Sequence, residues 1–259
     1  MDSGLFGVVV AGTNGEFSSL SNEERRVLYK TAVDESKEGK RVICNVGCES
    51  TWKTLDLSLY CGDIGADCLM IAPPYKRFSD EEGIFQHYKM ISYQVSLPII
   101  LFNAPSYGYP NLHPALVHRL TELENVVGIK EAELSIYQIM DQIRFNGDKI
   151  SILSGAGANV LPAMSVGAKG VITTWPEFVP ETAVRLLDLI KSGDLKGALE
   201  IHRKILPLAR SVGDANRIKA GFSMIDLPAG PPRLPLLPAT AEEKEEIRKA
   251  LLNLQILND

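Results

Sequence analysis

The sequence lacks the features that mark several large classes of protein. It has no run of about 20 apolar residues, which a membrane-spanning helix needs, and Met1 to Gly4 begins no signal peptide. It has no cluster of basic residues, and its formal charge of -5 gives little support for binding to nucleic acid or to a membrane surface. We therefore expect a cytoplasmic protein that binds a small molecule.

The motifs of disulfide, metal and nucleotide sites are also missing. The four cysteines form no Cys-x-x-Cys pair and lie in or beside apolar runs, which is typical of reduced, structural thiols. None of the four histidines stands at a metal-ligand spacing from a cysteine or a carboxylate. A Walker loop, a Gly-x-Gly-x-x-Gly fingerprint and a Gly-x-Ser-x-Gly elbow are absent. We expect neither a metal nor a cofactor.

What the sequence does contain is a regular alternation of short apolar runs and helical patterns. The run at 6–11 is β-branched and predicts a strand that is buried on both faces of a parallel sheet. Ser21 and Glu24 form a capping box that predicts a helix to about residue 38. Six further strands are expected, each followed by a helical pattern, at 41–46, 68–72, 98–102, 126–130, 150–154 and 170–173.

Seven strand-helix units favour a TIM-type (β/α)8 barrel over a doubly wound sheet. A closed barrel of this kind has eight units, and the missing one would come before residue 6. We therefore expect a barrel over residues 1–192 without its first unit, in a protein whose natural chain is longer. Three helical patterns beyond it, interrupted by a proline-rich segment, predict a C-terminal helical region at 193–259.

One strand of the expected barrel ends in a lysine, Lys130. The carboxyl ends of barrel strands converge on one mouth, where sites form. A lysine at a strand end usually extends to water. Among apolar neighbours, however, its pKa would fall from ~10.4 toward neutrality. The free amine could then form a Schiff base with a carbonyl substrate.

The loop Gly12-Thr13-Asn14-Gly15-Glu16 complements this lysine. Its glycines let backbone amides turn toward one point, and a helix N-terminus follows, so a carboxylate or phosphate is the natural ligand. The same residues are equally compatible with a simple tight turn.

Six motifs together resemble one known family, and they occur in its order and spacing over essentially the whole chain. The sequence is similar to the dihydrodipicolinate synthase and N-acetylneuraminate lyase family. The motifs are Gly12-Thr13-Asn14-Gly15-Glu16, Ala72-Pro73-Pro74-Tyr75, Phe102-Asn103-Ala104-Pro105, Gly128-Ile129-Lys130-Glu131-Ala132, Leu153-Ser154-Gly155 and Arg233-Leu234-Pro235-Leu236.

This resemblance implies a barrel, usually a homotetramer, in which a lysine forms a Schiff base with pyruvate or a related 2-oxo acid. It makes Lys130 the imine-forming lysine and has Thr13 and Asn14 hold the pyruvate carboxylate. Tyr75 would be lent across a subunit interface to a hydroxyl relay through Thr13. The remaining residues expected to line the substrate site are Gly155, Ile172 and Tyr107.

Two positions depart from the family pattern. Phe102 stands where the family has the tyrosine that serves as acid and base beside the imine. Tyr107 stands where the synthases carry an arginine for the carboxylate of the aldehyde. Loss of a positioned acid or base costs roughly 10²- to 10⁴-fold, which would cripple the usual reaction unless another hydroxyl acts. Tyr107, Tyr109 and Tyr75 are candidates, with Tyr107 nearest in sequence. Both departures indicate an enzyme outside lysine biosynthesis.

The leading interpretation is a class I aldolase or lyase that acts on a 2-oxo acid and an aldehyde as a homo-oligomer, a tetramer or a dimer. Two alternatives stay open. The protein could bind a 2-oxo acid without turnover, as a sensor or a structural subunit. It could also be a sugar-acid dehydratase that uses the same imine.

Overall fold

The computed structural model describes residues 4–36, 39–75, 80–227 and 229–258. The chain forms two compact units. The first, here called the sheet unit, comprises residues 6–12 and 21–172. The second, the helical unit, comprises the described parts of Met1–Leu5, Thr13–Leu20 and Thr173–Asp259.

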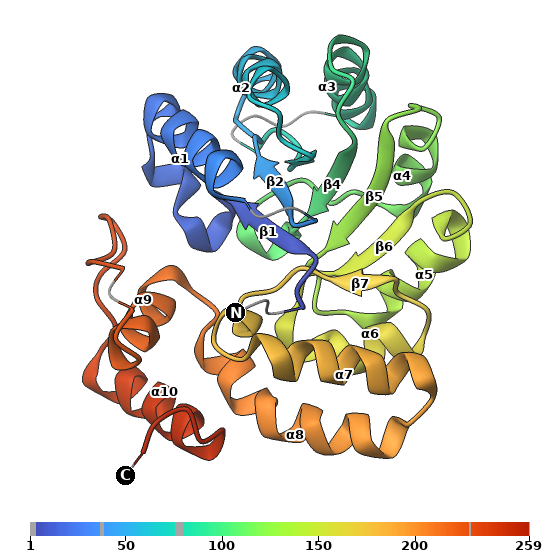
Figure 1. The fold of residues 1–259 in the computed structure, drawn as a ribbon. Coiled ribbons are helices and arrows are strands. Elements are labelled where there is room, and N and C mark those ends of the chain that lie inside the picture. Colours follow the sequence, from blue (N-terminus) through green and yellow to red (C-terminus); the bar gives the residue numbers. More distant parts are fainter. Residues whose placement is uncertain (1–3, 37–38, 76–79, 228, 259) are drawn as a thin grey trace. The chain divides into compact units, whose positions relative to one another are not determined.

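The sheet unit contains a single sheet in which each strand pairs in parallel with the next one along the chain (Figure 1). The strands are β1 (Gly7–Val10), β2 (Arg41–Asn45), β3 (Cys68–Ile71), β4 (Ile99–Asn103), β5 (Val126–Glu131), β6 (Ser151–Ser154) and β7 (Gly170–Val171). All seven strands predicted from the sequence are therefore confirmed, with ends that differ by at most two residues.

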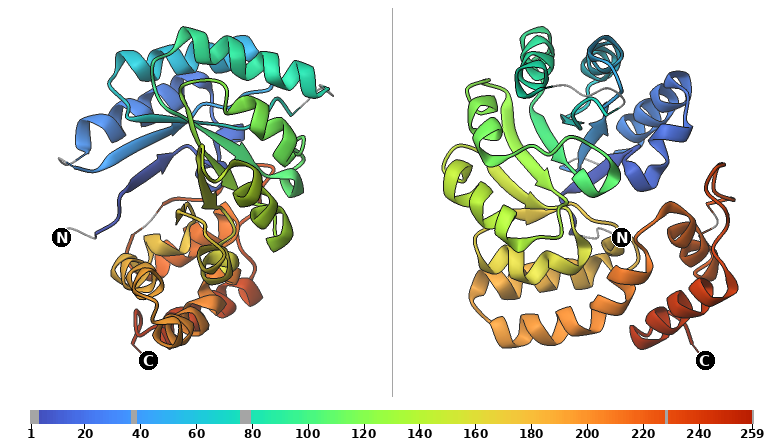
Figure 2. Two further views of the ribbon diagram at one scale, coloured as in Figure 1. Left: turned by 90° about the vertical axis from the view of Figure 1, so that its right-hand side faces the viewer. Right: turned by 180° about the vertical axis from the view of Figure 1, so that it is seen from behind.

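Helices lie side by side along the outer face of this curved sheet, each in contact with the next (Figures 1 and 2). They are α1 (Asn22–Glu35), α2 (Thr51–Asp63), α3 (Glu81–Gln94), α4 (Pro114–Leu120), α5 (Ile136–Asn146) and α6 (Val160–Ser165). The predicted capping box starts α1: Ser21 Oγ accepts from the Glu24 amide at 3.2 Å, and a Glu24 carboxylate oxygen accepts from the Ser21 amide at 2.8 Å.

The sheet is open in the part of the chain that the structure describes, because its order runs from β1 to β7 without pairing between those two strands. The α/β architecture with parallel strands is confirmed, whereas a closed barrel is not seen. One expectation is wrong: β1 is not buried on both faces, since Val8 is 55% and the preceding Phe6 73% exposed. The reason is that β1 pairs with β2 alone among the described strands, while β3 and β4 are fully buried between neighbours.

The helical unit consists of α7 (Pro180–Ser192), α8 (Leu195–Ser211), α9 (Ala215–Met224) and α10 (Ala241–Asn253), with short 3-10 helices η1 (Thr13–Gly15), η2 (Phe17–Ser19) and η5 (Trp175–Glu177). Within it α8 packs against both α7 and α10, α9 packs against α10, and η1 contacts α9 (Figure 1). The predicted C-terminal helices are thus present. The boundary expected at residue 192 stays a prediction.

No helix in the described ranges is long and apolar enough to cross a membrane. The four cysteines are free and buried, as their positions in apolar runs predicted.

Candidate active site around Lys130

Lys130 is the second-last residue of β5 and lies between the ends of β4 and β6. In the sheet register it stands opposite Phe102 on one side and Leu153 on the other. Its Nζ atom lies 4.4 Å from the centre of the Phe102 ring. The lysine therefore occupies the strand-end position predicted from the sequence, with an aromatic ring beside its amine.

Burial changes the protonation of this lysine. Although the residue keeps some exposed surface, desolvation of its ammonium group lowers the pKa of Lys130 from 10.5 to about 8. Among the described residues no carboxylate lies within ion-pair distance of Nζ to reverse this shift. At pH 7 about a tenth of the molecules would then carry the free amine.

Gly155, just beyond β6, leaves the space that the Lys130 side chain needs. A Cβ atom at this position would lie 3.0 Å from Lys130 Cε and 2.9 Å from Ala132 Cβ. The Gly155 amide donates to the Glu131 carbonyl at 2.7 Å, which ties β6 to the end of β5. Ile172 follows β7, and its amide donates to the Ser154 carbonyl at 2.9 Å. Both predicted lining residues thus belong to the strand ends on the β6 side of Lys130.

Three aromatic rings form a connected cluster on the other side of the lysine. The Phe102 and Tyr109 ring centres are 5.9 Å apart, and Tyr109 meets Tyr75 edge to face at 5.3 Å. Tyr109 is buried, and desolvation raises its phenol pKa well above the usual value. Tyr107, by contrast, is 51% exposed. The structure therefore places Tyr109, rather than Tyr107, against the residue beside Lys130.

A buried polar network behind these strand ends escaped the sequence analysis. The Glu131 carboxylate accepts hydrogen bonds from Asn103 Nδ2, from Gln138 Nε2 and from the Glu133 amide, each at 3.0 Å. Burial raises the pKa of Glu131 against the opposing effect of these donors. The available signal was that Asn103 and Glu131 are polar residues at the ends of two strands that are otherwise apolar.

Asn103 also anchors the loop that carries Tyr109. Its Oδ1 atom accepts from the Leu112 amide at 2.9 Å, and its Nδ2 donates to Asn111 Oδ1 at 2.9 Å. These bonds fix the end of the segment that begins at Pro105. The network therefore holds both the end of β5 and the loop of the aromatic cluster.

The remaining predicted residues, Thr13 and Asn14, lie in η1 and belong to the helical unit, whereas the other predicted site residues belong to the sheet unit. Thr13 Oγ1 is buried and has no hydrogen-bond partner among the described residues. A buried hydroxyl without a partner costs free energy unless a ligand supplies one.

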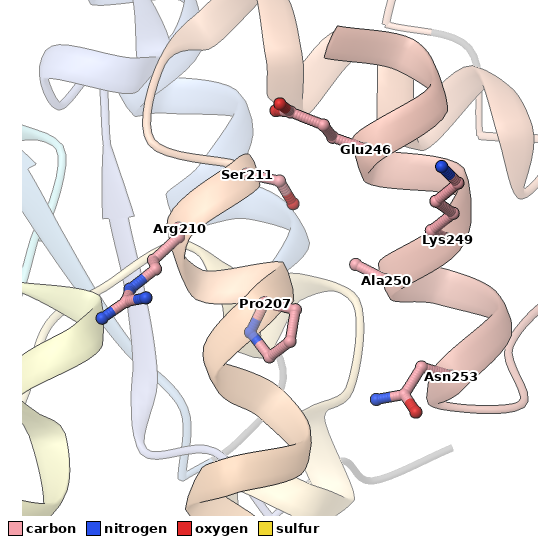
Figure 3. Close-up of a pocket in the computed structure, with 7 residues that line it drawn as sticks. All are labelled: Pro207, Arg210, Ser211, Glu246, Lys249, Ala250 and Asn253. Carbon is pink, nitrogen blue, oxygen red and sulfur yellow. The ribbon is translucent and has the colours of Figure 1, made fainter. Parts of the chain in front are cut away.

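A groove of about 470 Å³ lies in the helical unit between α8 and α10 (Figure 3). Ser211 on α8 faces Glu246 and Lys249 on α10, while Arg210 points away from α10 (Figure 3). The Lys249 side chain is 72% exposed and lies 3.8 Å from a Glu245 oxygen. Lys249 is not buried as Lys130 is, so we assign this groove no chemistry. No cluster of three His, Cys, Asp or Glu side chains suited to a metal occurs in the described ranges.

A comparison with known protein families matches residues 1–254 to the dihydrodipicolinate synthetase family. The chain belongs to this family. The protein is accordingly an enzyme, a lyase. A relative from Halalkalibacterium halodurans, 4-hydroxy-tetrahydrodipicolinate synthase 1, is 35% identical over 252 residues, which are 96% of this chain and 85% of the relative.

Solved structures of family members agree closely with the fold. The chloride-inhibited dihydrodipicolinate synthase from Acinetobacter baumannii, complexed with pyruvate, has a TM-score of 0.93 at 29% identity and covers 99% of this chain and 89% of its own. A monomeric dihydrodipicolinate synthase variant has a TM-score of 0.94 at 30% identity and covers 99% and 88%. Because one such variant is monomeric, the expected tetramer or dimer stays a prediction.

The names of these relatives bear on the expected pathway and on the two alternative functions. Several are named 4-hydroxy-tetrahydrodipicolinate synthase, so the inference from Phe102 and Tyr107 that this family member lies outside lysine biosynthesis gains no support. The sensor and dehydratase alternatives are not favoured either.

Substitution of Gly155 by Ala tests the packing around the lysine. We expect Gly155→Ala to destabilise the protein by about 1–3 kcal/mol, because the new methyl group overlaps Ala132 and crowds Lys130. Gly62→Ala in α2 is the control, since nothing lies within 4 Å of its added Cβ and alanine favours helix. Chemical denaturation measures the free energy of unfolding of both variants. Equal values would contradict the close packing of Ala132 and Lys130 around Gly155.

Substitution of Lys130 by Met tests its desolvation. The folded-state pKa lies below the unfolded value, so the cost of burying the charge is fully present below pH 8 and disappears above pH 10.5. We expect Lys130→Met to raise the free energy of unfolding at pH 7 by about 3 kcal/mol. Denaturation of both proteins near pH 7 and near pH 11 checks this. If the free energies of unfolding of the variant and the wild type differ by the same amount at both pH values, Lys130 carries no buried charge.

Proposed function

We propose that the protein forms a Schiff base between Lys130 and pyruvate or a related 2-oxo acid, and that it joins this 2-oxo acid to an aldehyde or cleaves the product. The observation that carries the proposal is the buried amine of Lys130, whose pKa is lowered to about 8 by desolvation. An amine with this pKa is nucleophilic near neutral pH. Pyruvate is the first choice because a family member with the same fold was crystallised with it.

The reaction begins when the Lys130 amine attacks the C2 carbonyl carbon and water leaves, giving the protonated imine. Loss of a proton from C3 then gives an enamine. The enamine carbon bonds to the aldehyde carbon, whose oxygen takes up a proton, and water finally hydrolyses the imine. The relatives named 4-hydroxy-tetrahydrodipicolinate synthase make aspartate semialdehyde the first aldehyde to test.

These proton transfers need a hydroxyl that Phe102 cannot provide. Tyr109 packs against the Phe102 ring, which also lies beside the amine of Lys130. We assign the acid and base role to the Tyr109 hydroxyl. Tyr75 touches Tyr109 edge to face within the same chain. We keep for Tyr75 the expected part in a relay through Thr13 across a subunit interface.

Binding of the substrate carboxylate is assigned to Thr13 and Asn14. The Thr13 hydroxyl is buried and finds no hydrogen-bond partner in the part of the chain that the structure describes, and a carboxylate oxygen could be that partner. Gly155 and Ile172 would bound the 2-oxo acid at the ends of β6 and β7. Tyr107, which is half exposed, is left for contacts with the aldehyde.

Reduction with borohydride in the presence of pyruvate tests the Schiff base. We expect a stable adduct on the peptide that contains Lys130, detected by mass spectrometry, because hydride reduces the imine to a secondary amine. The rate of adduct formation should rise as pH increases through about 8, where the amine loses its proton.

Lys130→Met is the negative control, and Lys149, an exposed lysine after α5, is the internal one. A folded wild-type protein that gives no adduct, or an adduct on another lysine, would reject the proposal.

Substitution of Tyr109 by Phe tests the proposed acid and base. We expect kcat to fall by roughly 10²- to 10⁴-fold with little change in pyruvate binding, since only the hydroxyl is lost. Tyr93→Phe is the matched control, because this tyrosine on α3 is 74% exposed. A wild-type kcat for Tyr109→Phe, together with a large loss for Tyr107→Phe, would move the role to Tyr107.

A further inference from the structure

The loop that carries Thr13 and Asn14 ends in a glutamate with an unusual backbone conformation. Glu16 has a φ of 57°, in the left-handed region, and its amide donates to the Thr13 carbonyl at 3.1 Å. Such a conformation is costly for a residue with a side chain and persists when surrounding contacts hold it. The contacts of Glu16 therefore bear on the shape of the turn at Thr13–Gly15.

Two residues from the far end of the sequence hold the Glu16 carboxylate. Lys219 on α9 forms an ion pair with Oε2, and the Arg233 amide donates to Oε1 at 2.7 Å. Arg233 also donates from Nη1 to the Ser19 carbonyl at 3.1 Å. The carboxylate and the next turn of the loop are thus both attached to this part of the helical unit.

The ion pair is largely shielded from water, so salt screens it less than an ion pair on the surface. The Glu16 and Lys219 side chains are only 10% and 19% exposed. Burial alone would raise the pKa of Glu16, but the hydrogen bonds and charges of Lys219 and Arg233 lower it overall. Lys219 in turn donates to the Pro231 carbonyl at 3.0 Å, so α9, the proline-rich segment and the loop are joined through one ammonium group.

We propose that Lys219 and Arg233 are positioning residues that act through Glu16 to hold the Thr13–Asn14 turn in the shape that binds the substrate carboxylate. We call the contacts of Lys219 and Arg233 with Glu16, and of Arg233 with Ser19, the clamp. The clamp follows from these contacts, whereas the identity of the ligand rests on the proposed function. It gives the Arg233-Leu234-Pro235-Leu236 motif a role in substrate binding without contact with the substrate.

The clamp acts on binding rather than on the chemistry at the lysine. A turn that is already held in its binding shape loses less conformational freedom when the ligand arrives. A displacement of about 1 Å caused by a distant change can cost up to about 100-fold. Loss of the clamp should therefore appear mainly in KM for the 2-oxo acid.

Substitution of Lys219 by Met is the central test. We expect KM for pyruvate to rise by about 10- to 100-fold, with a much smaller change in kcat, in steady-state assays. Lys219→Arg should recover most of the affinity because it keeps the charge opposite Glu16. Lys249→Met, which removes an exposed lysine from α10, should match the wild type.

Hydrogen exchange gives a second measurement that does not depend on pyruvate. We expect the amides of residues 13–19 to exchange faster in Lys219→Met and in Glu16→Gln than in the wild type and in Lys249→Met. Faster exchange in Lys219→Arg as well, equal to that in Lys219→Met, would show a packing effect and overturn the ionic clamp.

The two proposals fail in different ways. If wild-type protein forms no borohydride adduct with pyruvate, the proposed function fails, and the exchange rates still test the clamp. If the adduct forms but KM and the exchange rates of a folded Lys219→Met protein equal those of the wild type, the clamp is rejected and the proposed function stands.

Discussion

The site depends on a lysine amine that the fold buries without a compensating negative charge from any of the described residues. Neutral groups lie beside Lys130: the Phe102 ring at 4.4 Å, Gly155, and Leu153 opposite it in the register of β6. A carboxylate beside the amine would have restored a high pKa and removed the nucleophile at neutral pH. The protein accepts a loss of stability at this position, as functional sites commonly do.

Alternation along β4 and β5 separates the reactive groups from the supporting ones. Phe102 and Lys130 stand opposite one another in the register, as do the next residues, Asn103 and Glu131. Because side chains of successive strand residues point to opposite faces, the first pair can face the substrate while the second forms the buried network. A one-residue slip would exchange the two pairs, so the network also specifies the register that presents the lysine.

Much of the fold could be predicted because strands buried in a parallel sheet are continuous apolar runs, and Lys130 interrupts one of them. The exposure of β1 could not be predicted, because Phe6 to Val10 has the composition of a buried strand. The order of the strands in the sheet is what shows that β1 lies at an edge. The Glu131 network was missed for a similar reason. Its donors come from Asn103 and Gln138, and which residues meet across strands and helices is not visible in sequence spacing.

The choice between the two tyrosines shows how a single turn decides a site. Tyr107 is nearer to Phe102 in sequence, and distance along the chain favoured it. Gly108, however, has a φ of 84°, which reverses the chain between the two tyrosines, leaving Tyr107 half exposed and Tyr109 buried against Phe102. The Asn103 bond to the Leu112 amide then fixes the far end of the loop. The Tyr109 ring, seven residues after Phe102, thereby joins the aromatic cluster beside the lysine.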